Sequence, residues 1–148
     1  MEIWHATEPA RNLSIRSIVK GWRAVDKINL AQKFALFTEH WSPKIIGELN
    51  NFGVKVVKVQ GEFVWHHHEV EDELFFVVSG RLLMHVRDMT GEQSDIWVEP
   101  GELIIIPHGV EHCPAAKEET QVMLLEPATT VNTGNIVSEL TVSHLDQL

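Results

Sequence analysis

The residues of this chain that could do chemistry are mostly histidines, and six of the nine lie between residues 66 and 112. In a β-strand, successive side chains point to opposite faces, so His66 and His68 would share one face. Glu73 follows after a loop short enough to fold it back beside them, and His112 lies on a later predicted strand. Three imidazoles and one carboxylate that converge inside a barrel would form a tight site for a divalent transition metal.

This ligand set also predicts how such a site would behave. Four protein ligands on one side of an octahedron leave two adjacent positions for water, substrate or O₂. The histidines must be neutral and Glu73 ionised to bind the ion, so acid should release it. The set accepts Fe, Mn, Ni, Zn or Cu, and we expect one such ion per chain. Glu73 is also the candidate catalytic residue, because a carboxylate that leaves the metal could act as a base.

The remaining histidines have other interpretations. If His67 were the ligand, alternation would pair it with Trp65 and Glu69, which supplies no second histidine, so we expect His67 to point outward. His108 lies inside a tight turn and is expected to be exposed. His85 could line the pocket or lie outside it, and the sequence leaves both possibilities open.

Two further residues, Arg81 and Cys113, have charged or reactive side chains. Arg81 could orient an anionic substrate or simply end a strand in solvent. Cys113 is the only cysteine, which excludes an intramolecular disulfide and any multi-cysteine metal site. No base is placed beside it, so we interpret Cys113 as a small buried residue rather than a nucleophile. The sequence contains no glycine-rich phosphate loop, nucleophile elbow or HExxH motif.

The elements that would position these residues are short strands. From residue 44, apolar segments recur at about ten-residue spacing with glycine and proline between them, which indicates a β-sandwich or barrel. Before them, residues 29–37 predict a short helix capped by Asn29. Residues 1–27 have no clean periodicity and are expected to form an arm, with room for one strand, on the outside of the domain. The predicted strands are 44–49, 54–60, 62–68, 74–79, 81–87, 93–98, 103–106, 110–113 and 121–126.

Composition limits the class of protein. The 148 residues are 44% hydrophobic and 22% charged, which fits one globular domain. Twelve basic residues against 21 acidic ones give a net charge of −9, which argues against binding to nucleic acid or to an anionic membrane. No apolar run is long enough to span a bilayer, and no secretory signal is visible, so a cytoplasmic location is expected.

The histidines and glycines follow a spacing that resembles the two motifs of the cupin superfamily, G-x5-H-x-H-x3–4-E-x6-G and G-x5-P-x-G-x2-H-x3-N. Two positions depart from the pattern: Gly61 precedes His66 by one residue fewer, and Ala116 stands where the second motif ends in Asn. Neither departure removes a ligand. The matching positions are His66, His68, Glu73, Gly80, Gly101, Pro107, Gly109 and His112.

The resemblance implies an all-β fold, the double-stranded β-helix also known as the cupin or jelly-roll barrel. In this chain the barrel would cover residues 44–127, after an N-terminal arm and short helix (1–43) and before a C-terminal tail (128–148). It also implies a homodimer with the metal near one mouth of each barrel. One pair of motifs indicates a single-barrel member, similar to small cupins that are sometimes labelled mannose-6-phosphate isomerase-like, a label that the motifs do not specifically support.

Two functions are compatible with this resemblance. The first is a metal-dependent enzyme, either a dioxygenase or an isomerase or lyase, which acts on a small oxygen-bearing molecule bound to the metal. The alternative is a non-catalytic module that binds a small molecule or a metal, because many cupins keep the fold without known turnover.

Overall fold

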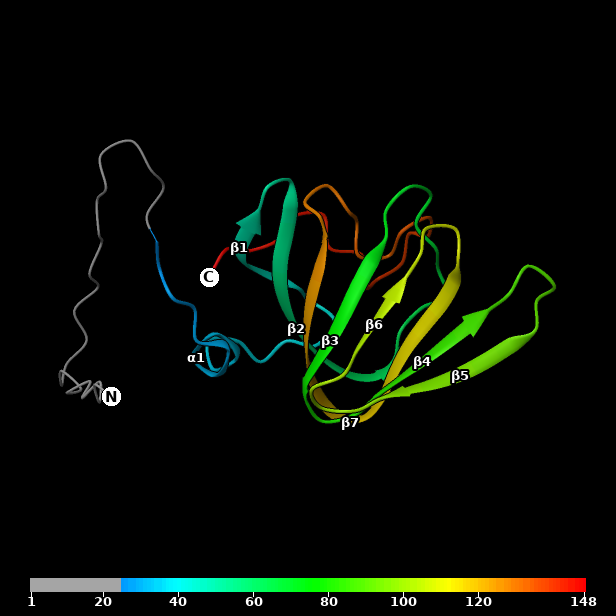
Figure 1. Ribbon diagram of the computed structural model, residues 1–148, viewed down its shortest axis with the longest axis horizontal. Helices are drawn as coiled ribbons and strands as arrows, with labels where there is room; N and C mark the ends of the chain where they lie inside the picture. Colours follow the sequence, from blue (N-terminus) through cyan, green and yellow to red (C-terminus); the bar gives the residue numbers. More distant parts are fainter. Residues whose placement is uncertain (1–24) are drawn as a thin grey trace, which may run out of the picture.

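The structure of this chain is a computed structural model that describes residues 25–148 (Figure 1). The arm predicted over residues 1–27 therefore lies outside the described residues except for its last three. One short helix and seven strands follow in chain order: α1 (Leu30–Phe34), β1 (Lys44–Leu49), β2 (Phe52–Glu62), β3 (Glu73–Ser79), β4 (Leu82–Arg87), β5 (Gln93–Val98), β6 (Leu103–Ile106) and β7 (Glu111–Pro127).

Helix α1 forms where the sequence predicts a helix, although it is shorter. The side chain of Asn29 accepts a hydrogen bond from the amide of Gln32 (3.0 Å) and caps the first turn, as predicted. Phe34 and Phe37 are buried in an apolar cluster with Val56, so the helix region covers the outer face of β2. No helix within residues 25–148 has both the length and the apolar character needed to cross a membrane.

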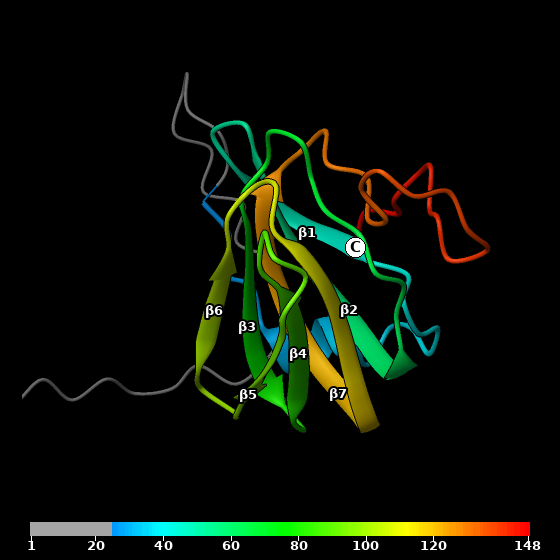
Figure 2. The ribbon, with the colours of Figure 1, turned by 90° about the vertical axis from the view of Figure 1, so that its right-hand side faces the viewer.

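The strands pair antiparallel throughout, in the order β1-β2-β7-β3-β6, and β4 pairs with both β5 and β7. Strand β7 joins the two parts of the sheet. Its first residues pair with β4, whereas its later residues lie between β2 and β3 (Figure 2). The sheet consequently curves around one interior, which confirms the predicted all-β jelly-roll fold.

The interior is filled by alternate residues of these strands. On β3, Phe75 and Val77 point inward, and on β4, Leu82 and Met84 do so, each with no more than 6% of its surface exposed. Glu73 continues the same inward face of β3. The same alternation that places apolar side chains in the core therefore places the Glu73 carboxylate at one end of the interior.

Two strand predictions were wrong. Residues 62–68 do not form a strand: β2 ends at Glu62, just after Gly61 turns the chain with a φ of +84°, and only His66 pairs again, in an isolated bridge to His112. The predicted strands 110–113 and 121–126 are parts of the single strand β7, because the residues between them continue the ladder with β2 and β4.

Residues 128–148 lack regular secondary structure but run back along the barrel. Near the end of the chain, the Leu148 amide donates to the carbonyl of Ile45, and the Ile45 amide donates to that of Asp146 (both 2.9 Å). These bonds join the C-terminal segment to the edge strand β1.

Candidate metal centre

The structure brings together all four predicted ligands. One potential ligand atom from each of His66, His68, Glu73 and His112 lies within 4.8 Å of the others, and all four residues are buried. Glu73 begins β3 and His112 lies on β7, whereas the other two histidines lie on the connection between β2 and β3. The two histidines on the connection both face the interior, as a strand would have placed them.

The ring orientation of two imidazoles suits metal binding. The Nδ1 atom of His66 lies 2.9 Å from the carbonyl of Val64, and that of His112 lies 3.0 Å from the carbonyl of Val110. A carbonyl oxygen can only accept, so each Nδ1 must carry the hydrogen. This fixes the tautomer that leaves the lone pair of Nε2 free to bind a metal.

The carboxylate lies between two of these rings. Oε2 of Glu73 is 3.3 Å from Nε2 of His68 and 3.4 Å from Nε2 of His112, and none of these three buried atoms has a hydrogen-bond partner. Buried polar atoms without partners are rare because they are costly. Metal bonds of about 2.1 Å place neighbouring ligands about 3 Å apart, so a shared cation fits this arrangement.

The charge states also suit a metal. Burial and the neighbouring His112 lower the pKa of His66 to about 4, which keeps this imidazole neutral at pH 7. Burial alone would raise the pKa of Glu73, but its contacts with His112 and His68 outweigh burial and lower it. Burial disfavours the charged form of His68, yet the Glu73 carboxylate raises the His68 pKa overall. A proton therefore competes with a metal more strongly at His68 than at His66.

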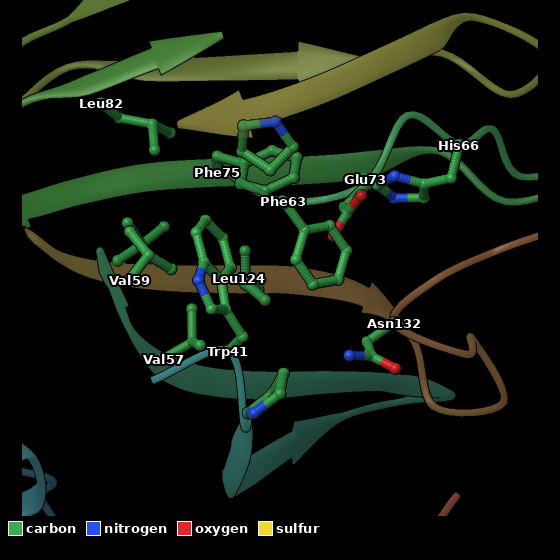
Figure 3. A pocket seen from close by; sticks show the side chains of 13 residues that line it. Trp41, Val57, Val59, Phe63, His66, Glu73, Phe75, Leu82, Leu124 and Asn132 are labelled. Carbon is green, nitrogen blue, oxygen red and sulfur yellow. The ribbon is translucent and has the colours of Figure 1, made fainter. Parts of the chain in front are cut away.

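A cavity inside the barrel leads to the cluster. His66 and Glu73 bound one end of it, and aliphatic and aromatic side chains together with Asn132 bound the rest (Figure 3). Trp41 and Phe63 form an aromatic pair along this cavity, with ring centroids 4.8 Å apart. A molecule in the cavity would reach the ligand cluster with one end and apolar walls with the other.

The other histidines lie outside this cluster. His67 is partly exposed and contacts Glu69 (3.0 Å), and exposed His108 contacts Asp72 (2.9 Å). His85, which the sequence left open, does not line the cavity.

Arg81 and Cys113 do not take part in the site either. Arg81 forms an ion pair with Glu99 at the end of its strand and lies over the ring of Trp97. Burial, together with the charge of Glu62, raises the pKa of the Cys113 thiol to about 11, which does not suit a nucleophile.

Sequence reasoning missed a buried ion pair next to the cluster. Nζ of Lys55 lies 2.7 Å from Glu126, and both side chains are 1% exposed. The β3–β7 register pairs Leu74 with Leu125, which sets Glu126 beside Glu73. Burial and the charge of Glu73 raise the pKa of Glu126. Strand alternation was the available signal, because Lys55 shares the inward face of β2 with Val57.

Sequence reasoning also missed the role of the C-terminal segment. The side chain of Asn132 lines the cavity, and the backbone of Gly134 lies against the loop that carries His66. Thr133, between them, is fully buried. The polar composition of residues 128–148 gave no signal for these contacts.

Comparison with known proteins agrees with this geometry. The cupin domain model matches residues 53–127. A cupin-2 domain protein of known structure from Shewanella frigidimarina is 49% identical, with 68% of this chain and 93% of that one covered and a TM-score of 0.63. A protein of known structure from Neisseria meningitidis is 30% identical, with 70% and 100% covered and a TM-score of 0.59.

Among curated proteins, the acireductone dioxygenase of Bacillus cytotoxicus is 33% identical over 63 residues, which are 43% of this chain and 37% of that enzyme. The matches span only 37% to 56% of the first curated relatives. The family is nevertheless clear from the domain match, the fold and the converging histidines and glutamate: this chain belongs to the cupins.

Proposed function

We propose that this protein is a metal-dependent dioxygenase that acts on a small oxygen-bearing molecule and holds one divalent transition metal ion per chain. His66, His68, Glu73 and His112 are the proposed ligands. One observation carries the proposal: Nε2 of His68, Oε2 of Glu73 and Nε2 of His112 are buried, face one another and have no hydrogen-bond partner. A cation is the simplest group that satisfies all three atoms.

A bound ion would supply a Lewis acid and a template for the oxygen atoms of the substrate. The protein contributes orientation, because the carbonyls of Val64 and Val110 hold two imidazoles in the ligating tautomer. Glu73, ionised at neutral pH, is both a ligand and the group placed to accept a proton from a substrate hydroxyl. The walls of the cavity are mostly apolar, which disfavours water beside the cluster.

We favour oxygen chemistry over isomerisation or elimination. Support comes from the acireductone dioxygenase of Bacillus cytotoxicus, which aligns at 33% identity over 63 residues. A transition metal held by His66, His68, Glu73 and His112 would supply the redox chemistry that a reaction with O₂ requires and that isomerisation does not.

We also propose that the protein forms a homodimer through the outer face of β3 and β6. Leu103 and Ile105 are each 55% exposed, and the strand register places them opposite Phe76 and Leu74. These four side chains form an apolar surface at the edge of the sheet, which a second copy could cover. Sedimentation equilibrium should show a dimer, and Ile105→Glu should convert it to a monomer; a monomeric parent protein would contradict the proposal.

The dioxygenase proposal can be tested directly. Protein stripped with a chelator is reloaded in turn with Fe(II), Mn(II), Ni(II), Zn(II) and Cu(II), and bound metal is counted by elemental analysis. Oxygen uptake is then measured against a panel of enediols and catechols. We expect one ion per chain and oxygen uptake that Glu73→Gln and His112→Ala abolish. Full metal loading without turnover would instead assign the chain to the non-catalytic binding proteins.

A further inference from the structure

The cavity beside the metal cluster has no charged side chain apart from its His66 and Glu73 end. Among residues 25–148, no lysine or arginine lines it. The side-chain amide of Asn132, which does line it, is largely engaged: its nitrogen donates to the carbonyl of Leu140 (2.8 Å) and its oxygen accepts from the amide of Val142 (2.9 Å), which leaves one N–H. Away from the cluster, an anionic group in this cavity would lose its water and gain at most this one N–H.

The walls of the cavity are aromatic on one side. Trp41 packs on Phe63 with ring centroids 4.8 Å apart and an angle of 31° between the ring planes. The indole nitrogen of Trp41 is also occupied, because it donates to the carbonyl of Gln60 (2.9 Å). The indole therefore presents a ring surface rather than a hydrogen bond to the cavity (Figure 3).

The backbone of Trp41 adopts an unusual conformation that directs its side chain to the cavity. Its φ is +58°, a left-handed conformation that is rare for a bulky residue and unfavourable in energy. A hydrogen bond from its amide to the carbonyl of Lys58 (2.9 Å) holds the residue there. Trp41 lies outside the segment that matches the cupin domain, so the family pattern does not account for it.

The size of the cavity limits what could bind. The centre of a water-sized molecule can occupy about 40 Å³ of it. This small volume favours a ligand no larger than a single ring.

We propose that the cavity binds a small, neutral, single-ring phenol of the catechol type, with the ring against Trp41 and Phe63 and its oxygen atoms toward His66 and Glu73. The inference rests on the proposed function, because the metal cluster is what receives the oxygen atoms. It makes Trp41 a substrate-binding residue from the segment before the barrel. It also disfavours sugar phosphates, because once the substrate hydroxyls occupy the cluster, no lysine or arginine in the cavity wall is left to neutralise the phosphate.

The test is calorimetric titration of 4-methylcatechol into zinc-loaded protein under nitrogen, so that no turnover occurs. We expect Trp41→Ala to weaken binding at least tenfold. Trp97→Ala is the matched control and should bind like the parent, because Trp97 is 47% exposed on β5 and does not line the cavity. Phe63→Leu, which keeps an apolar wall, should weaken binding several-fold and serves if Trp41→Ala does not fold.

Two outcomes would overturn the inference: equal binding by the parent and Trp41→Ala at the same zinc content, or tighter binding of mannose 6-phosphate than of 4-methylcatechol. The same titration on metal-free protein separates the inference from the proposed function. If the protein does not load zinc but Trp41→Ala still weakens binding of 4-methylcatechol to the metal-free protein, the proposed function is contradicted and the inference is not. If the protein loads zinc but Trp41→Ala binds 4-methylcatechol like the parent, both with and without zinc, the inference is contradicted and the proposed function is not.

Discussion

Asn135 holds the peptide backbone of His67 at two points, although 68 residues separate them. Its side-chain oxygen accepts a hydrogen bond from the backbone amide of His67 (2.9 Å), and the backbone amide of Asn135 donates to the His67 carbonyl (3.1 Å). The preceding residue, Gly134, lies so close that a Cβ there would be 2.2 Å from the His67 oxygen and 3.2 Å from Cδ2 of His66. The C-terminal segment thus positions the loop that carries two proposed ligands.

Replacement of Gly134 should therefore weaken metal binding without removing a ligand. In Gly134→Ala, the new methyl group must push the backbone of His67 away and tilt His66 out of the cluster. We expect the affinity for Zn(II) to fall by about tenfold or more, in the range typical of changes to groups that orient metal ligands. Competition with a chromophoric chelator measures this affinity.

Gly91→Ala is the control for that experiment. Gly91 also has a positive φ, +84°, but a Cβ there meets nothing within 4 Å. This variant carries backbone strain without contact to the site and should bind metal like the parent. If both variants lose affinity to the same extent, the C-terminal segment does not position the ligands.

Acid should release the metal at a pH set by His68 rather than by His66. The Glu73 carboxylate raises the pKa of His68 above 6.5, so a proton occupies this ligand as the pH falls toward neutrality. The pKa of His66 is lowered to about 4, so this imidazole stays free until the solution is far more acidic. We expect the affinity for Co(II), followed by its absorbance, to fall by up to tenfold per pH unit below 6.5, the limit for one competing proton. A constant affinity between pH 8 and pH 5 would contradict this account.

The buried pair of Lys55 and Glu126 should stabilise the fold only as long as the two charges neutralise each other. Glu126→Gln keeps an oxygen that can accept from Lys55 but leaves its ammonium buried without an opposite charge, and should lower the free energy of unfolding by about 3 kcal/mol. The double variant Lys55→Met/Glu126→Leu removes both charges and should lose much less. Urea unfolding at pH 9 measures both, because burial and the charge of Glu73 raise the pKa of Glu126 to about 8 and its carboxyl is ionised above that pH.

The exposed pair of Arg81 and Glu99 offers the comparison, because Arg81→Met should change stability by less than about 1 kcal/mol. Equal losses in Glu126→Gln and in the double variant would show that the lost volume, rather than an unpaired charge, causes the effect.

The sequence was sufficient for the features that depend on local alternation and motif spacing. Period-two patterning placed Glu73 and Phe75 on one inward face, and the motif spacing identified three histidines that the fold brings together. Alternation even gave the correct face for His66 and His68, where no regular strand exists.

Features that depend on distant contacts could not be predicted. Lys55 and Glu126 find each other only because β2 and β7 are neighbours in the folded sheet. Trp41 and Asn132 line the cavity from segments without regular secondary structure, and such segments have no periodic sequence pattern from which their path could be predicted. The end of strand β2 could not be predicted either. Gly61 permits the turn at which β2 stops, but a glycine at this position does not by itself require a turn.

The most direct test of the account compares His67→Ala with His68→Ala. Both remove one imidazole from the same loop, but only His68 points into the buried cluster, while His67 faces Glu69 near the surface. Elemental analysis of the two purified variants, loaded side by side with Zn(II), should show about one ion per chain in His67→Ala and little in His68→Ala. Equal metal content in the two variants would contradict the proposed metal centre.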